Sequence, residues 1–279
     1  MIDALVALSA LAVTLLHVSL APKLDPGPSE RCPDDMRLVR GAHYDEMQHL
    51  CVDARKDAKD THCFEYFPDL SAEEGPVVDV DVCMDMFEAP NQRGKRALVM
   101  KSYEMAEQWC GDRHKRVCRE EEWEEACEGG DKRPLAYGWK VDKSTCNSGK
   151  GWRQFDVKKL YSRDKDEARQ ETERLWQGEP SGTYAACVSP FGIYDLMGNV
   201  EEWVTSRKGR RYKGALMGGF WAKPWTGCRG TNDAHEESFT FYETGFRCCA
   251  DPGTLDAQGN KKKKPKRAKP DAPRQEGPR

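Results

Sequence analysis

The sequence predicts an exported, disulfide-stabilised domain that combines short strands and short helices with long loops. Twelve cysteines are distributed through 279 residues, nearly all of them singly. Eight tryptophans provide large apolar side chains in a chain whose mean hydropathy is only -0.82. Two stretches alternate apolar and polar residues with a period of two, which is typical of half-buried strands.

The cysteine spacing favours disulfides over a metal site or a redox dithiol. Neither Cys-x-x-Cys nor His-x-x-x-His occurs, so a zinc ribbon and a thioredoxin-like motif are not expected. Stable disulfides require an oxidising compartment. We therefore expect the domain to lie outside the cytoplasm, as a secreted, periplasmic or membrane-anchored protein.

The first residues agree with export. Residues 4–21 form an almost uncharged apolar run, long enough for a signal peptide or a membrane anchor. Ser19-Leu20-Ala21 resembles a cleavage site, but Pro22 follows it and Asp3 stands where a positive charge is usual. Signal peptide and anchor therefore stay alternatives for residues 1–21, and residues 22–31 are expected to be a linker.

The folded domain is expected at residues 32–255. Met36–Val39 and Val77–Phe87 carry the alternating pattern of strands, and residues 51–71 between them are expected to be rich in turns. Two short helices follow. Tyr103–Trp109 begins after Ser102, a good N-cap residue, and Glu120–Ala126 carries acids in its first turn, where the helix dipole favours them. The remaining acids of the second helix are expected to form a solvated face.

The second half of the domain is expected to hold an insertion and two strands. Residues 151–178 are strongly charged and are interpreted as an insertion, with an exposed helix over 163–176. One strand is expected at 212–221, broken by two glycines, and a closing strand at 245–250. Residues 256–279 are expected to form a disordered basic tail that could contact an anionic surface. No base-reading motif occurs, so specific nucleic-acid binding is not expected.

The stretch at 191–203, FGIYDLMGNVEEW, combines aromatic bulk with three acids. Asp195, Glu201 and Glu202 are too many carboxylates to remain unpaired in a half-buried loop. They require either arginine partners, such as Arg229 or Arg247, or a hard metal ion.

Eight motifs occur in the order found in the formylglycine-generating enzyme (sulfatase-modifying factor) family, which this chain resembles from about residue 34 to 251. The resemblance implies a single α+β domain with a C-type-lectin-like fold, little regular secondary structure, disulfides and bound calcium. The motifs are MRLVRGAHY, VCMDMFEAPN, SYEMAEQWC, RVCREEEWEEACEGG, YGW, FGIYDLMGNVEEW, RYKGALMGGFW and GFRCCAD.

The resemblance also implies specific bonds and ligands. It pairs Cys110 with Cys248 and Cys127 with Cys228, and we further expect Cys146 with Cys187. Cys118 with Cys249 is one candidate pair, and the pairing of Cys32, Cys51, Cys63, Cys83, Cys118 and Cys249 stays open. The family's calcium site corresponds to the Asp195 and Glu202 side chains with the Gly198 and Val200 carbonyls, and a second calcium site would start at Asn147.

The sequence departs from the family where its members bind copper. The family oxidises a substrate cysteine at copper held by two cysteines, and thiolates suit Cu(I). The position of the first cysteine is Lys223 here, and the segment from Lys223 to Cys228 is too short for the second. Copper is therefore not expected, no catalytic residue can be assigned, and cysteine-to-formylglycine activity is expected to be lost.

Two main functions remain as hypotheses, beside a third in which the chain is a structural envelope protein held at a surface by its hydrophobic N-terminus and basic tail. The first is an extracytoplasmic module that binds a peptide, protein or glycan at the old substrate cleft, lined by Phe220, Trp221, Lys223 and Trp225. The second is a divergent metal-dependent oxidoreductase whose ligands would come from Glu201, His235, Glu236 and Glu237. An alternative for the two tryptophans is simple core packing, and for the His-Glu-Glu run a solvated loop.

Overall fold

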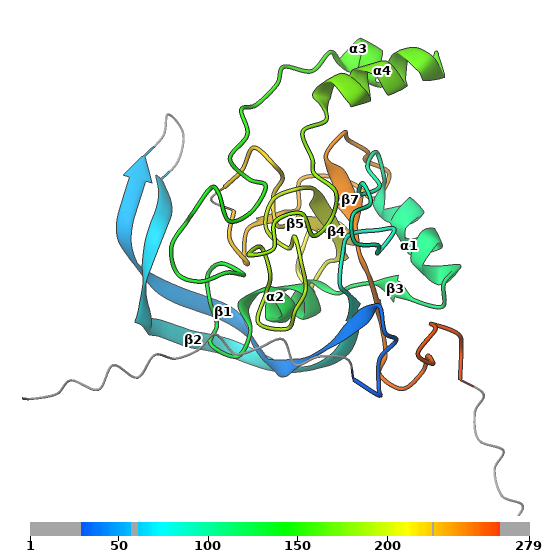
Figure 1. Ribbon diagram of the computed structural model, residues 1–279. Coiled ribbons are helices and arrows are strands. Elements are labelled where there is room, and N and C mark those ends of the chain that lie inside the picture. Colours follow the sequence, from blue (N-terminus) through cyan, green and yellow to red (C-terminus); the bar gives the residue numbers. More distant parts are fainter. Residues whose placement is uncertain (1–28, 57–60, 225, 263–279) are drawn as a thin grey trace, which may run out of the picture.

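The computed structural model describes residues 29–56, 61–224 and 226–262 (Figure 1). These residues form two four-stranded sheets and four short helices joined by long loops, so the α+β class predicted with little regular structure is confirmed. None of the described helices is long and apolar enough to cross a membrane. Residues 1–21, Trp225 and most of the basic tail lie outside the described residues.

The first sheet is built on a long antiparallel hairpin. Strand β1, Met36–Lys56, pairs with β2, Thr61–Asp85, and the short strands β8, Cys248–Ala250, and β3, Arg116–Val117, extend the sheet in the order β1-β2-β8-β3. Outer parts of the two long strands project beyond the body of the domain (Figure 1).

The prediction that residues 51–71 are rich in turns is wrong, because most of this segment belongs to β1 and β2. The outer hairpin exposes both faces to some degree, so burial does not impose the one-sided apolar alternation by which strands are recognised in a sequence. A disulfide between Cys51 and Cys63 links the two strands there.

The second sheet has the order β6-β5-β4-β7. Its central strand β4, Glu201–Thr205, pairs antiparallel with β5, Gly214–Met217, and parallel with β7, Thr244–Phe246, while β6, Thr231–Asn232, lies at the edge. Strand β5 ends at a Gly-Gly pair with φ of 81° and 66°, a conformation that glycine adopts readily. The expected strand at 245–250 is split into β7 and β8, which belong to different sheets.

Four helices are placed around these sheets. Helix α1, Tyr103–Gly111, starts at Ser102, whose hydroxyl accepts a hydrogen bond from the Met105 amide at 3.2 Å. Helix α2, Glu120–Glu128, lies against β1 and β2 near the centre of the molecule (Figure 1). Helices α3, Val157–Leu160, and α4, Lys165–Leu175, form the insertion.

Six disulfides link the elements, and the structure contains the three pairings expected from the sequence together with the candidate pair Cys118–Cys249. Each of the three longest-range bonds joins residues more than a hundred positions apart, so two of them tie the N-terminal half of the domain to β8 and the third ties it to the loop before β6. The bonds are Cys32–Cys83, Cys51–Cys63, Cys110–Cys248, Cys118–Cys249, Cys127–Cys228 and Cys146–Cys187.

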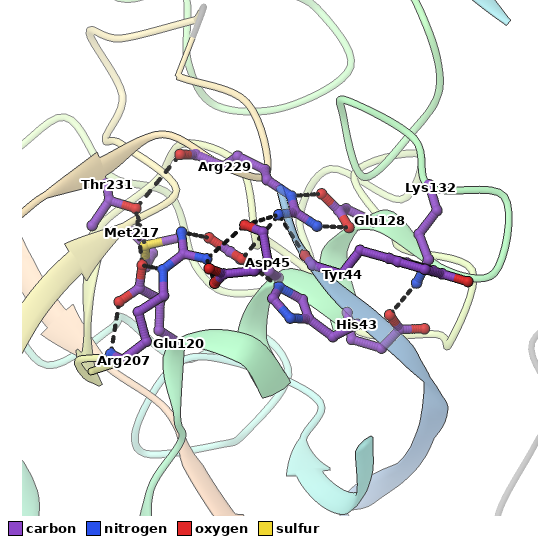
Figure 2. A network of polar contacts seen from close by, with 12 residues as sticks. His43, Tyr44, Asp45, Glu120, Glu128, Lys132, Arg207, Met217, Arg229 and Thr231 are labelled. Carbon is purple, nitrogen blue, oxygen red and sulfur yellow. Dashed lines mark hydrogen bonds and ion pairs between the residues drawn. The ribbon is translucent and has the colours of Figure 1, made fainter. Parts of the chain in front are cut away.

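All acids of α2 except Glu121 are buried, which corrects the prediction of a solvated face. Glu120, Glu124 and Glu128 recur every four residues and so lie on one side of the helix, with Glu125 beside them. Glu120 and Glu128 meet arginines from the loops of the second sheet (Figure 2), and Glu124 and Glu125 also have cationic partners. Charge alone does not distinguish a solvated face from a buried one when the partner cations come from distant parts of the chain.

The network joins α2, the hairpin and the loops of the second sheet. Glu120 accepts hydrogen bonds from Arg210 at 2.5 Å, and Glu124 contacts His43 of β1 at 2.6 Å. Arg229 forms a bidentate ion pair with Glu128 and donates to the Tyr44 carbonyl of β1 at 2.8 Å. The base of the hairpin is therefore fixed by charge-assisted hydrogen bonds.

Replacing Arg229 with alanine should lower the free energy of unfolding by about 3 kcal/mol, because Glu128, fully buried, would lose its cation. Chemical denaturation measures this. As a control, Arg169→Ala removes an ion pair with Asp166 whose side chains are both more than 70% exposed, and the change should be below about 0.5 kcal/mol. Equal losses in both variants would show that the buried network does not stabilise the fold.

Candidate functional site

The loop at 191–203 is fixed by a buried ion pair. Arg247, between β7 and β8, donates from Nε to Glu202 Oε2 at 2.6 Å and from Nη2 to Oε1 at 2.5 Å. The indole of Trp123 on α2 donates to the same carboxylate at 2.8 Å. Of the partners considered for this acid, Arg247 is therefore the one that binds it.

Two further acids surround this pair. Glu88 accepts hydrogen bonds from Ser181 at 2.8 Å and from the Asn199 amide at 2.9 Å, and Asp195 accepts one from the Gly182 amide at 2.6 Å. Burial raises the pKa of Asp195 to about 6. Burial and the charges of Asp195 and Glu202 raise the pKa of Glu88 well above its ordinary value. The buried carboxyl groups of Glu88, Asp195 and Glu202 therefore surround a single buried guanidinium, that of Arg247.

These residues fit a hard cation in charge but only partly in geometry. A divalent cation would offset the excess of carboxylates, and Asn147 presents a buried Oδ1 without a hydrogen-bond partner among the described residues. Both oxygens of Glu202, however, are bound by Arg247. Within the described part of the chain, no group of three or more His, Cys, Asp or Glu residues is arranged to hold a metal ion.

The residues expected to line the old substrate cleft differ in how far the structure buries them. Phe220 and Trp221 are buried, whereas Lys223 keeps 37% of its side chain exposed. The Lys223 ammonium lies 2.8 Å from Glu201 Oε1 and 5.0 Å from the centre of the Phe220 ring. Trp225 is not among the described residues.

The insertion packs over the two buried aromatic residues. Trp176 meets Trp221 edge-on, with ring centres 5.1 Å apart, and Leu160 and Leu175 belong to the same apolar cluster. Tyr161 donates a hydrogen bond to the Thr240 carbonyl at 2.6 Å. Phe220 and Trp221 are therefore core residues beneath α3 and α4, which was the alternative considered for the tryptophan in the sequence.

Glu243 is a further functional candidate near these residues, and it was not predicted from the sequence. Its side chain is buried, and Oε2 has no hydrogen-bond partner among the described residues. Burial and the negative charge of Glu201 raise the pKa of Glu243 to about 8. The available signal was an acid set among aromatic residues in the stretch FTFYETGF.

The residues proposed for an alternative metal site are in other contacts. His235 stacks on Phe239 with ring centres 3.7 Å apart. Glu236 accepts a hydrogen bond from Ser238, and Glu237 accepts one from the Lys213 amide. Burial lowers the pKa of His235. The metal-dependent oxidoreductase stays a prediction for which the geometry adds no support.

The geometry defines a disulfide-rich α+β domain whose two sheets enclose buried ion pairs, and comparison with known proteins gives its family. The sulfatase-modifying factor enzyme 1-like domain matches residues 74–252. The chain belongs to this family, which confirms the resemblance noted in the sequence. No similar sequence was found among curated proteins.

Three solved structures are similar to this chain at low sequence identity. PvdO from Pseudomonas aeruginosa is 15% identical, with a TM-score of 0.43 over 75% of this chain and 93% of that one. CarF is 14% identical, with a TM-score of 0.48 over 78% and 98%. Treponema denticola variable protein 1 is 12% identical, with a TM-score of 0.44 over 72% and 99%.

Glu243 should make the stability of the domain depend on pH. Between about pH 4.5 and 8 the unfolded chain releases the proton of Glu243 while the folded protein keeps it, so the free energy of unfolding falls as the pH rises. Glu243→Gln has no such proton. The free energy of unfolding of the variant, relative to that of the wild type, should therefore rise by about 3 kcal/mol between pH 5 and pH 8. Chemical denaturation at each pH measures this difference.

The matched control is Glu236→Gln, which changes an exposed acid in the same region and should follow the wild-type pH profile. Parallel profiles for Glu243→Gln and the wild type would contradict the prediction, because they would mean that Glu243 ionises equally in the folded and unfolded states.

Proposed function

We propose that this domain is a binding module that has lost the copper-dependent oxidation of its family. One observation carries the proposal. All twelve cysteines lie within the described residues and all twelve form disulfides. No pair of thiolates is therefore left to bind Cu(I), which prefers soft sulfur ligands.

The electrostatics of the cleft favour the same conclusion. Lys223 stands where the resemblance places the first copper cysteine, and its ammonium forms an ion pair with Glu201 at 2.8 Å. An ammonium ion has no lone pair to donate to a metal and repels a cation. Restoring the oxidase would require changes at both positions of the missing cysteine pair.

The ligand would bind where aromatic and cationic groups remain accessible beside the filled cleft. Trp152 and Tyr161 of the insertion are 56% and 47% exposed, and Lys223 is partly exposed. Exposed aromatic rings beside a cation suit peptides and glycans. With six disulfides, we place the domain outside the cytoplasm, where residues 4–21 would direct or anchor it and the basic tail could contact an anionic surface.

The purified, oxidised protein should not convert a Cys-x-Pro-x-Arg peptide to its formylglycine product when incubated with Cu(I) and oxygen. Mass spectrometry of the peptide measures conversion, and a metal-free reaction is the control. Conversion above this control would overturn the proposal, because it would show that the family's chemistry survives without a cysteine pair.

The binding surface is tested with an array of printed glycans and a displayed library of random peptides. Probes that bind the wild type should bind at least tenfold more weakly to Trp152→Ala and Lys223→Ala. Met105→Ala is the control, because Met105 is 50% exposed on α1, outside this surface. Binding unaffected by the two site variants, or absent from both arrays, would overturn the assignment of this surface.

We also propose that calcium stabilises the loop at 191–203. The support is the excess of buried acids around Arg247 and the unpartnered Oδ1 of Asn147. Asp195 and Glu202 with the carbonyls of Gly198 and Val200 would hold the ion, and all of these donors are oxygen atoms, which calcium prefers. Glu202 would have to give up a hydrogen bond to Arg247 in order to bind it. Asn147 would contribute to a second site.

Adding Ca²⁺ to the chelator-treated protein should raise the melting temperature, since a ligand at a hundred times its Kd stabilises the folded state by about 2.7 kcal/mol. Asp195→Asn should remove most of this increase. The exposed acid Asp142, replaced by Asn, serves as the control and should leave it intact. A melting temperature independent of Ca²⁺ in the wild type would show that the buried acids are neutralised by protons and Arg247 alone.

A further inference from the structure

The exposed large apolar side chains of this domain gather on the hairpin. Of ten such residues among those described, six lie on β1 or β2, although these strands make up a small part of the chain. An exposed apolar group of this kind usually marks a contact surface. The six residues are Leu50, Val52, Phe67, Leu70, Val77 and Val78.

Four of these residues form one apolar face on the outer hairpin, residues 45–56 and 61–75. The rings of His49 and Tyr66 contact each other, and His49 also meets Trp139 of the domain body. His49 pairs with Ser71 and Cys51 pairs with Tyr66, and directly paired residues point to the same side of a hairpin. Their neighbours Leu50, Phe67 and Leu70 therefore point to the opposite side, away from the body. Leu50, Val52, Phe67 and Leu70 are each about half exposed and are called the apolar face below.

The outer hairpin is held in a fixed position. The Cys51–Cys63 disulfide links its strands, and main-chain hydrogen bonds join it to the loop that contains Trp139, from the Tyr66 amide at 2.8 Å and from the Val141 amide to the Phe64 carbonyl at 2.8 Å. Its base is fixed by the α2 network. A preorganised surface loses little conformational entropy on binding.

The outer hairpin carries a negative formal charge. Seven acids stand against two bases in residues 45–56 and 61–75, a formal net charge of 2 minus 7, or -5. Three of the acids form ion pairs, Asp53 with Arg55 at 2.6 Å, Asp45 with Arg207 at 3.0 Å and Glu65 with Lys140 at 2.8 Å, so the exposed acids Glu46, Glu73 and Glu74 carry most of the negative charge. The acids are Asp45, Glu46, Asp53, Glu65, Asp69, Glu73 and Glu74.

We propose that the apolar face docks a segment of another protein that presents large apolar side chains among lysines and arginines. The surface is separate from the cleft and does not depend on the function proposed for it. Charge decides between the possible occupants. A second copy of the hairpin would bring acids against acids, and an anionic membrane would repel them. The basic tail, residues 263–279, has the right charge but offers only alanine and proline as apolar side chains.

A synthetic peptide of alternating leucine and lysine serves as the probe, with the leucine–glutamate peptide as its charge control. Fluorescence anisotropy should show binding of the lysine peptide and not of the glutamate peptide. The double variant Leu50→Ser/Phe67→Ser should weaken binding at least tenfold. The double variant Met105→Ser/Val157→Ser, which changes equally exposed apolar residues elsewhere, should bind as the wild type does.

A second variant keeps the apolar face intact. Glu73→Lys/Glu74→Lys reverses two exposed charges and should weaken the lysine peptide while allowing the glutamate peptide to bind. Binding of the lysine peptide that is unchanged in both hairpin variants would overturn the proposal. So would dimerisation or binding to anionic vesicles that is lost in Leu50→Ser/Phe67→Ser, because the apolar face would then serve a second copy or a membrane.

Discussion

The buried guanidinium of Arg247 connects the parts of this fold. It lies where the chain leaves the second sheet after β7 and enters the first sheet as β8, and it binds Glu202 on β4. It also donates to the carbonyls of Tyr194 at 2.9 Å and Asp85 at 3.2 Å, which belong to the central loop and to β2. A lysine could not replace it, because only the planar guanidinium supplies several donors in fixed directions.

Buried ion pairs also fix helix α2, which lies near the centre of the molecule although few of its residues are apolar. Glu120, Glu124 and Glu128 fill positions that apolar side chains usually occupy on a buried helix face. Each is costly to bury and acceptable only because arginines from the second sheet's loops reach it. The ion pairs therefore specify which loops meet the helix, beyond the contribution of Trp123 and Cys127 to the core.

The sequence was sufficient for the parts of the fold that short-range signals or family motifs encode. The N-cap Ser102, the helix starts and the glycine break after β5 follow from local chemistry, and the motifs placed Cys110 and Cys248 together. The outer hairpin could not be recognised, because its strands lack a buried face. Glu243 and the insertion's contact with Trp221 depend on residues brought together only by tertiary packing.

The interactions that hold this fold together are separate from the groups that it leaves accessible. The Arg247 pair and the long-range disulfides hold the two sheets together. At the cleft expected from the resemblance, Lys223 pairs with Glu201, and Trp176 of the insertion covers Trp221. Accessible apolar and aromatic groups are concentrated on the insertion and on the outer hairpin. Most of the outer hairpin precedes the region that matches the family. These two segments therefore carry the surfaces for which we propose recognition of a partner.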